Sequence, residues 1–373
     1  MVYLDHAATT PVPRAVADVM YAVLTEQFGN PSAQYPMGLE MKRRVEAWRA
    51  TVAQAVGCEP GRLFFTSCGT EGDNWALRAA CWHNRRVGRH IVTTAVEHHA
   101  VLNCCRQLEQ EGWEVTRLLP DANGDISAEA VLSAVRPDTA LVSVMMVNNE
   151  LGSIYPIADI AKGLKAVNEK TLLHTDAVQG FLKVPFSAKT LGADFITLSG
   201  HKIGAPKGIG ALYVKKGLRL PPLTFGGGQE RGMRPGTEAV PNIAAFAKAC
   251  EIRMAHFDED YAHVQELADY LKQQVSAELP DAVINGEGDI PHVVNLSMPG
   301  CKSEVMLHVL EGDEVYISSG SACSKGKQSG VLKALGLPKT RTDSALRVSF
   351  APFNTKEDVD AFIAAVKKGA KMF

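Results

Sequence analysis

Short apolar runs alternate with segments of helical spacing through the first two thirds of the chain. Several runs are rich in Val and Ile without strict alternation, which is typical of strands buried on both faces. The seven runs lie at 63–67, 90–96, 115–120, 140–147, 172–178, 195–200 and 209–214. Helical spacing occurs at 71–86, 100–110, 127–134 and 157–168. This alternation predicts an α/β fold, with a mostly parallel seven-stranded sheet and helices on both faces.

The pattern changes near residue 250. A long helical stretch at about 241–278 leads to a Pro-Asp turn at Pro280 and Asp281. Strand-like runs at 292–298, 315–318 and 345–350 then alternate with helical segments at 303–311 and 356–371. We therefore expect two domains. The larger would span 14–255, and a smaller α+β domain would span 256–373 together with residues 1–13.

Composition and charge are those of an ordinary globular protein. Of the 373 residues, 46% are hydrophobic, and the net charge of −2 predicts neither nucleic-acid nor membrane binding. The first residues lack a basic segment followed by an apolar one, which a signal peptide requires. No apolar run approaches the roughly 18 residues that a membrane span needs. We expect a cytoplasmic protein.

One of the eight cysteines has unusual surroundings. Seven lie in apolar or helical contexts and are expected to be reduced structural residues, and no two form a C-x-x-C pair. Cys323 instead follows a run of Ser, Gly and Ala, which predicts a mobile, exposed loop. Lys325 and Lys327 make that loop electropositive, which favours the thiolate.

Four of the apolar runs end in polar clusters. Ligands of open α/β sheets bind outside the carboxyl ends of the strands, so we expect these clusters to converge on one rim. They occupy 68–71, 148–150, 176–179 and 199–202. In the first cluster, Gly69 and Thr70 open a helix with Thr70 as the predicted N-cap, and a helix N-terminus binds phosphate. A capped helix without a ligand is equally compatible with that turn.

The other clusters supply the remaining parts of a pyridoxal phosphate (PLP) site. Lys202 follows a strand end, where neighbouring cations or burial make a lysine nucleophilic. Asp176, on an adjacent predicted strand end, is suited to pair with a protonated pyridine nitrogen. Gln179 lies one turn further and is within reach of the ring oxygen. Phosphate cradle, pyridine partner and Schiff-base lysine are the three parts that PLP requires.

Two further residues have competing interpretations. His98 follows a predicted strand and could stack on the cofactor ring and shuttle protons. Cys104 and Cys105 lie nearby, but their spacing matches no usual zinc-ligand pattern, so we expect no metal. Arg347 lies inside the strand-like run 345–350, where it either faces solvent or clamps a carboxylate in bidentate fashion.

Taken together, the motifs resemble those of cysteine desulfurases of the iron–sulfur cluster type, which have the class V aminotransferase fold. The resemblance runs from Tyr3 to the C-terminal helix. Its motifs are 3–11, 29–32, 69–71, Glu97-His98, 148–150, Asp176 with Gln179, 199–202, 234–237 and 318–323. It implies PLP as the cofactor and L-cysteine as the substrate, which is converted to L-alanine.

The resemblance also implies a role for each candidate residue. Lys202 would hold the cofactor, His98 would stack on its ring and assist proton transfer, and Asp176 and Gln179 would bind the pyridine nitrogen and ring hydroxyl. Arg347 would bind the substrate carboxylate. The phosphate would be held by Gly69, Thr70, Ser199 and His201, and Asn149 would contact both cofactor and substrate.

Sulfur transfer and assembly are implied in the same way. Cys323 would take the substrate sulfur as a persulfide and deliver it to an acceptor protein, either an iron–sulfur cluster scaffold or a tRNA-thiolation enzyme. Thr237 would reach the cofactor of the neighbouring subunit, which implies a homodimer. The chain departs from the family pattern at Tyr35, Cys68, Gly72 and Ala351, and the loop after Cys323 is about two residues shorter.

Two alternatives remain open at this point. A selenocysteine lyase or another class V transferase would use the same cofactor residues but would have less need of Cys323. A non-catalytic sulfur-assembly scaffold would belong to a different class of protein. The presence of Lys202, His98, Asp176 and Cys323 argues against a scaffold, which has no reason to keep all four.

Overall fold

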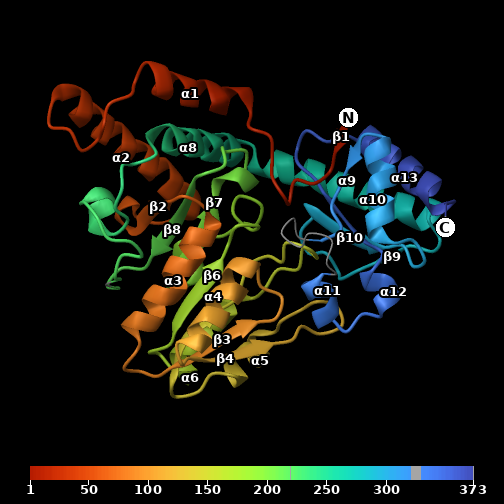
Figure 1. The fold of residues 1–373 in the computed structure, drawn as a ribbon, viewed down its shortest axis with the longest axis horizontal. Coiled ribbons are helices and arrows are strands. Elements are labelled where there is room, and N and C mark those ends of the chain that lie inside the picture. The colour runs from red at the N-terminus through yellow and green to blue at the C-terminus, as the bar shows by residue number, and fades with distance from the viewer. Residues whose placement is uncertain (219, 321–328, 373) are drawn as a thin grey trace.

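A seven-stranded sheet lies at the centre of the computed structural model, which describes residues 1–218, 220–320 and 329–372 (Figure 1). The spatial order is β2-β8-β7-β6-β5-β3-β4. Its strands are β2 (Leu63–Thr66), β3 (His90–Thr94), β4 (Glu114–Leu118), β5 (Thr139–Ser143), β6 (Leu172–Asp176), β7 (Phe195–Ser199) and β8 (Gly210–Val214). β8 is antiparallel to β2 and β7, and the other pairs are parallel. The predicted fold class is confirmed.

The strands are apolar throughout because both faces of the sheet are covered by helices. Phe64, Ile91 and Phe195 pack with α3 (Gly69–His83) and α4 (His99–Gln110). The next residue of each strand enters the core on the other face. That face carries α1 (Arg14–Thr25), α2 (Pro36–Val56), α5 (Ala128–Ser133), α6 (Ile157–Val167), α7 (Ala188–Leu191) and α8 (Val240–Ala255). This two-sided burial explains why the runs do not alternate with polar residues.

A second sheet lies toward the C-terminus, antiparallel and in the order β12-β10-β9. Its strands are β9 (Val283–Ile284), β10 (Val293–Ser297) and β12 (Ala345–Ser349). It packs with α9 (Phe257–Glu278), α10 (Ser303–Gly312) and α13 (Lys356–Ala370) in a separate hydrophobic core that also contains Leu4. β1 (Val2–Tyr3) pairs in parallel with β11 (Val315–Tyr316), so both chain ends lie on this side (Figure 1). The proposed division at residues 255 and 256 stays a prediction.

One predicted element is wrong in detail. The stretch 241–278 is not one helix, because the chain leaves the helical conformation at His256, between α8 and α9. Phe246 of α8 belongs to the core of the large sheet, whereas Leu267 of α9 belongs to the C-terminal core. The break lets one face of each helix point into a different core. Two short helices, α11 (Gly330–Ala334) and α12 (Lys339–Thr342), precede β12.

None of the helices within the described ranges combines the length and the apolar character that crossing a membrane would require.

Candidate active site

The carboxyl ends of β2, β3, β5, β6 and β7 lie at one edge of the sheet and surround a pocket of about 240 Å³. Of the predicted site residues that the structure describes, all except Thr237 line this pocket. Its walls are formed by Ala7, Ala8, Cys68, Gly69, Thr70, Asp73, His98, Met145, Asn149, Asp176, Val178, Gln179, Ser199, His201, Lys202 and Arg347. Six of the seven strands share one direction, and this common direction brings clusters from distant parts of the sequence together.

Lys202 lies in a 3-10 turn, Gly200–Lys202, directly after β7. Its Nζ donates hydrogen bonds to the carbonyl oxygens of Ala7, at 2.5 Å, and Ala8, at 2.8 Å. The N-terminal turn that contains Ala7 and Ala8 therefore lies at the pocket and holds the amine. Gly200 permits the tight turn, because a Cβ there would come within 2.9 Å of Ala205 and Ile209 side-chain atoms.

Asp176 ends β6 and is only 5% exposed. Its Oδ1 accepts a hydrogen bond from the backbone N–H of Val178 at 2.9 Å. Burial, reinforced by the nearby Asp73 carboxyl, raises the pKa of Asp176 to about 7, although Lys202 opposes the shift. A buried carboxyl with so little stabilisation of its negative charge is suited to a cationic ligand atom such as a protonated ring nitrogen.

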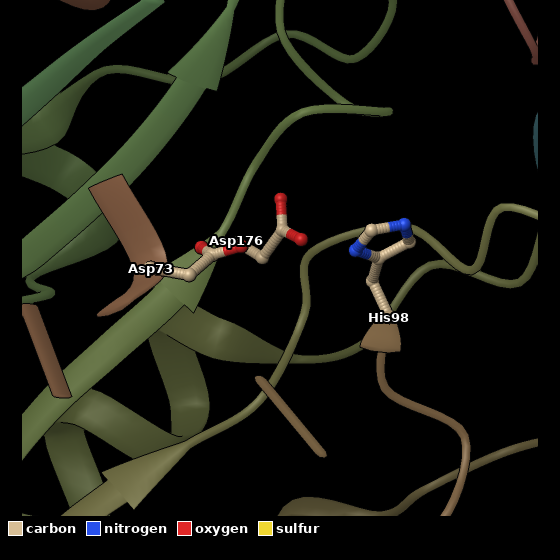
Figure 2. Close-up of side chains that lie close together, drawn as sticks. All are labelled: Asp73, His98 and Asp176. Atoms are coloured by element: carbon tan, nitrogen blue, oxygen red, sulfur yellow. The ribbon is translucent and has the colours of Figure 1, made fainter. Parts of the chain in front are cut away.

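His98 is the N-cap residue of α4, and its Nδ1 accepts a hydrogen bond from the N–H of Ala100 at 3.2 Å. Burial, together with Lys202 and His99, lowers the pKa of His98 to about 4, so the ring is neutral near pH 7. Figure 2 shows Asp176 lying between this ring and the Asp73 carboxyl. The imidazole is thus placed over the same space that the Asp176 carboxylate faces.

Cys104 and Cys105 belong to no group with the spacing of metal ligands among the described residues. In the ranges that the structure describes, the one group with the spacing of metal ligands is Asp73, His98 and Asp176, which includes neither cysteine. Both thiols are buried on α4 within the core that α3 and α4 share. Burial raises the pKa of each of these thiols to about 12, which disfavours the thiolate that binds zinc.

The phosphate turn differs from the prediction in one respect. α3 begins at Gly69 with Cys68 as its N-cap residue, so Thr70 is inside the helix and the predicted N-cap role of Thr70 is wrong. No side chain caps the helix, which leaves its first N–H groups available to a ligand. Gly69 packs closely on Val178, because a Cβ at Gly69 would lie 2.8 Å from a Val178 methyl carbon.

Arg347 does not face solvent. It is 1% exposed, and its guanidinium donates to Asp5 Oδ1 at 2.7 Å and to the carbonyl oxygen of Asn149 at 2.9 Å. Its Nε is buried and has no hydrogen-bond partner among the described residues. Burial raises the pKa of Asp5 even beside this guanidinium. A cation that is held in place and lines the pocket can receive a substrate carboxylate.

Gln179 is fixed from two sides. Its Nε2 donates to the carbonyl oxygen of Ala7 at 2.9 Å, and its Oε1 accepts from Nζ of the buried Lys183 at 3.2 Å. Since a carbonyl oxygen can only accept, the Ala7 contact determines which end of the amide carries the N–H groups. The amide N–H groups consequently face the Lys202 side of the pocket.

Of the two remaining predicted site residues, one lies apart from the pocket and the other is not described. Thr237 is exposed and does not contribute to the pocket of its own chain. Cys323 lies outside the described residues, as does the shortened segment after it. The described residues that flank this segment along the chain are Gly320 and Ser329. A Cβ added at Gly320 would lie 3.5 Å from Glu150 Oε2, and the Ser329 hydroxyl donates to the same carboxylate.

The departures from the family pattern fall in different places. Tyr35 is exposed at the N-terminus of α2, and Ala351 is buried. Cys68 lines the pocket and is half-buried. Gly72 lies below the pocket, where a Cβ would come within 2.7 Å of the Thr197 methyl carbon.

Comparison with known proteins decides the family. The model of the aminotransferase class-V family matches residues 2–362. The chain belongs to the class-V aminotransferase family. It is 41% identical to a cysteine desulfurase IscS of Methanosarcina thermophila, over 98% of this chain and 91% of the relative.

Solved structures agree with this class-V assignment. A NifS-like protein superposes with a TM-score of 0.94 at 35% identity, covering all of both chains. A structure described as SspA in complex with cysteine superposes with a TM-score of 0.84 at 32% identity, covering 95% of this chain and all of the other. The class-V fold is therefore shown over the whole described chain.

The cofactor of this class-V chain is PLP, and the residues present fit it. The pocket joins a lysine amine, a buried carboxyl and an uncapped helix N-terminus, which are the three partners that PLP needs. Ser199 lies beside that N-terminus, and His201 is also on the pocket wall.

Sequence reasoning missed several residues of this class-V site. Ala7 and Ala8 act through backbone carbonyls, which side-chain chemistry does not reveal. Asp5 and Lys183 act through contacts with Arg347 and Gln179. Asp5 and His6, followed by two alanines, belong to no predicted helix or strand. Such a polar pair outside any element could have indicated that the N-terminal segment contributes to the site.

Proposed function

We propose that this pocket removes sulfur from L-cysteine, leaves L-alanine as product, and passes the sulfur to Cys323 as a persulfide. The chain is a PLP-dependent cysteine desulfurase, the activity that its relatives carry at 39–41% identity over nearly the whole chain. The observation that carries the proposal is the placement of Lys202, Asp176 and Arg347 around one pocket.

Each pocket residue has a defined task in this proposal. Lys202 holds the cofactor covalently, and Asp176 binds its ring nitrogen. Gln179, oriented by the Ala7 carbonyl, donates an N–H to the ring oxygen. Gly69, Thr70, Ser199 and His201 bind the phosphate. When bound, PLP supplies an electron-accepting ring that stabilises negative charge on the carbon atoms of an attached amino acid.

Substrate binding and proton transfer fall to residues on the open side of the pocket. Arg347 and Asn149 receive the carboxylate of cysteine. The Arg347 guanidinium then binds this carboxylate and Asp5 together. His98 is neutral at pH 7, so it can stack on the ring and accept a proton. Lys202 moves a proton at its amine once it is released from the cofactor.

Sulfur transfer requires no external oxidant or reductant. The Cys323 thiolate attacks the sulfur of the substrate, so an S–S bond forms and the C–S bond breaks. The electron pair of the C–S bond stays on carbon, which takes up a proton to give alanine. Sulfur is oxidised to the level of a persulfide while carbon is reduced, so the step balances.

Three further parts of the proposal concern partners and location. The protein is a homodimer in which Thr237 reaches the cofactor of the neighbouring subunit, and the exposure of Thr237 supports this. The persulfide is delivered to an acceptor protein, either a cluster scaffold or a tRNA-thiolation enzyme. The protein acts in the cytoplasm.

The absorbance of the purified protein and the activity of one variant on cysteine and selenocysteine test the reaction. Purified protein should absorb near the edge of the visible range, and borohydride treatment should remove that band. Cys323→Ala should lose alanine formation from cysteine while it keeps the cofactor. If Cys323→Ala released sulfide from cysteine at the normal rate, the persulfide step would be wrong. Retained activity on selenocysteine alone would indicate a selenocysteine lyase, and the absence of any cofactor band would indicate a scaffold.

A further inference from the structure

Two buried carboxyl groups lie side by side on the floor of the pocket. Asp73 comes from α3 and is 1% exposed, and Asp176 comes from β6 and is 5% exposed. Both carboxyls and the His98 ring offer atoms that all lie within 4.8 Å of one another. Figure 2 shows the Asp73 carboxyl on the far side of Asp176 from His98. The ring-nitrogen partner therefore has a second acid behind it.

Among the described residues, no cation neutralises Asp73. His174 Nε2 lies 3.4 Å from Asp73 Oδ1, but burial lowers the pKa of His174 to about 4, so this imidazole is neutral. The hydroxyl of Thr197 binds His174 Nε2 at 3.0 Å and also hydrogen-bonds Asp73. On its other side, His174 Nδ1 meets the Ser143 hydroxyl at 2.9 Å. Oδ1 of Asp73 is buried without a hydrogen-bond partner among the described residues.

Gly72 makes room for this arrangement. Its missing Cβ would lie 2.7 Å from the methyl carbon of Thr197 and 3.3 Å from the Thr197 hydroxyl oxygen. A larger residue at 72 would push Thr197 away from Asp73 and His174. The small residue next to Asp73 is thus part of the structure that keeps the acid in place.

The other charged and titratable groups around the pair do not supply the missing positive charge at Asp73. Lys202 favours ionisation of Asp176. Glu97 lies below, with Oε1 accepting from the Met145 N–H and the Thr94 hydroxyl, both at 2.9 Å. Burial raises the pKa of Glu97 well above its usual range, which favours its neutral, protonated form. Two ionised carboxylates at this spacing in a buried site are unfavourable.

We propose that Asp73 is a positioning residue that shares a single proton with Asp176, so that the pair carries one negative charge toward the cofactor's ring nitrogen. The inference rests on the proposed role of Asp176 and deepens it. A protonated Asp73 offers an O–H to the Asp176 carboxylate, and this contact fixes the direction of that carboxylate. Removing the shared proton would place a second negative charge beneath the ring.

The pair makes the charge below the ring depend on pH near neutrality. Burial raises the pKa of Asp73 to about 7, as it does for Asp176. In Asp73→Asn an N–H replaces the O–H as donor, but this donor cannot ionise. The variant should therefore keep the geometry and lose one titration step.

Infrared difference spectra of the cofactor-free protein between acid and alkaline pH test this directly. We expect carboxylic-acid bands that disappear as pH rises through neutrality, with one band lost in Asp73→Asn. Glu97→Gln is the matched control, because it removes a buried carboxyl outside the pair and should leave the Asp73 band in place. An unchanged set of bands in Asp73→Asn would overturn the proposal.

A second measurement uses the loaded protein. The absorbance of bound PLP should titrate in one fewer step in Asp73→Asn than in the natural protein. Asp73→Ser, which keeps no carboxyl and a smaller side chain, should give the same loss if Asn disturbs folding. An identical titration in all three proteins would contradict the shared proton. Failure of the natural protein to bind PLP would instead refute the proposed function.

Discussion

The floor of the pocket and its substrate side are built in different ways. The floor, formed by Asp73, Asp176 and His174, lies within the sheet and the helix that covers it. In the part of the chain that the structure describes, Asp73 has no cationic partner. The substrate side joins Arg347 to Asp5 and Asn149, residues 342 and 198 positions away. The floor derives its chemistry from desolvation, whereas the substrate side derives it from an ion pair between distant segments.

The two regions therefore differ in how much of the chain must fold before they form. The floor is local to one core, because β6 carries His174 and Asp176 and α3, which packs on β6 and β7, carries Asp73. Arg347 lies on β12 of the C-terminal sheet, so it reaches the pocket only when both cores have formed. Changes to each region should therefore have separable effects.

Loss of Lys202, which stands between the two regions, should have the largest effect. Lys202→Ala removes the covalent attachment of PLP and an amine that moves protons, so we expect activity to fall by at least about a thousandfold. Borohydride should no longer fix the cofactor to the protein. Lys207→Ala, at an exposed lysine nearby, is the control and should change little. Comparable activity in both variants would contradict the assignment.

Arg347→Ala should affect the substrate side and the fold together. Removing one member of a buried ion pair costs about 3–5 kcal/mol, because Asp5 is left without its partner. We expect KM for cysteine to rise strongly and the midpoint of urea unfolding to fall. The PLP absorbance should remain, since no floor residue is changed. A normal KM in a folded variant would show that another group binds the carboxylate.

The floor should reveal itself through the pH dependence of stability. The pKa of Asp73 is raised from 3.8 to about 7, so the folded protein holds a proton that the unfolded chain has lost. The stability of the cofactor-free protein therefore falls as pH rises through this window. Asp73→Asn removes that loss, a relative gain of about 2 kcal/mol from pH ~5.5 to ~8. Urea unfolding at both pH values measures it, and parallel pH profiles would refute it.

Gly72→Ala should act on the floor through packing. The added methyl group would press on Thr197, at a cost of about 1–3 kcal/mol, and would shift the pH titration of the floor. Gly312→Ala is the matched helical control, because a Cβ at Gly312 meets nothing within 4 Å. Thermal unfolding of the two variants gives the comparison. Equal stabilities would mean that the space around Thr197 is less restricted than the structure indicates.

Much of the fold and of the floor could be predicted from the sequence. Continuous apolar runs identify strands buried on both faces, and the polar residues that follow them identify the rim. The break at His256 could not be predicted, because the apolar spacing continues through it while the two helices turn to different cores. The start of α3 could not be predicted either. Thr70 is a residue type that favours the N-cap position, but the residue at that position is Cys68.

The substrate side was less accessible to sequence reasoning. Within β12 every residue is buried, so periodicity does not indicate whether Arg347 faces solvent or a partner. Its partner Asp5 lies at the opposite end of the chain. Asp73 was recognisable as a polar residue near a helix start, but its burial against Asp176 depends on the packing of α3 on β6 and β7.

The transfer of sulfur to Cys323 is tested most directly by following the sulfur atom in a single turnover. Protein loaded with PLP and mixed with an equal amount of L-cysteine, without any acceptor or reductant, should form one alanine per sulfur transferred. Peptide mass spectrometry should then find one added sulfur atom on Cys323 and none on Cys68. Alanine formed at the normal rate with no added sulfur on Cys323 would contradict the account.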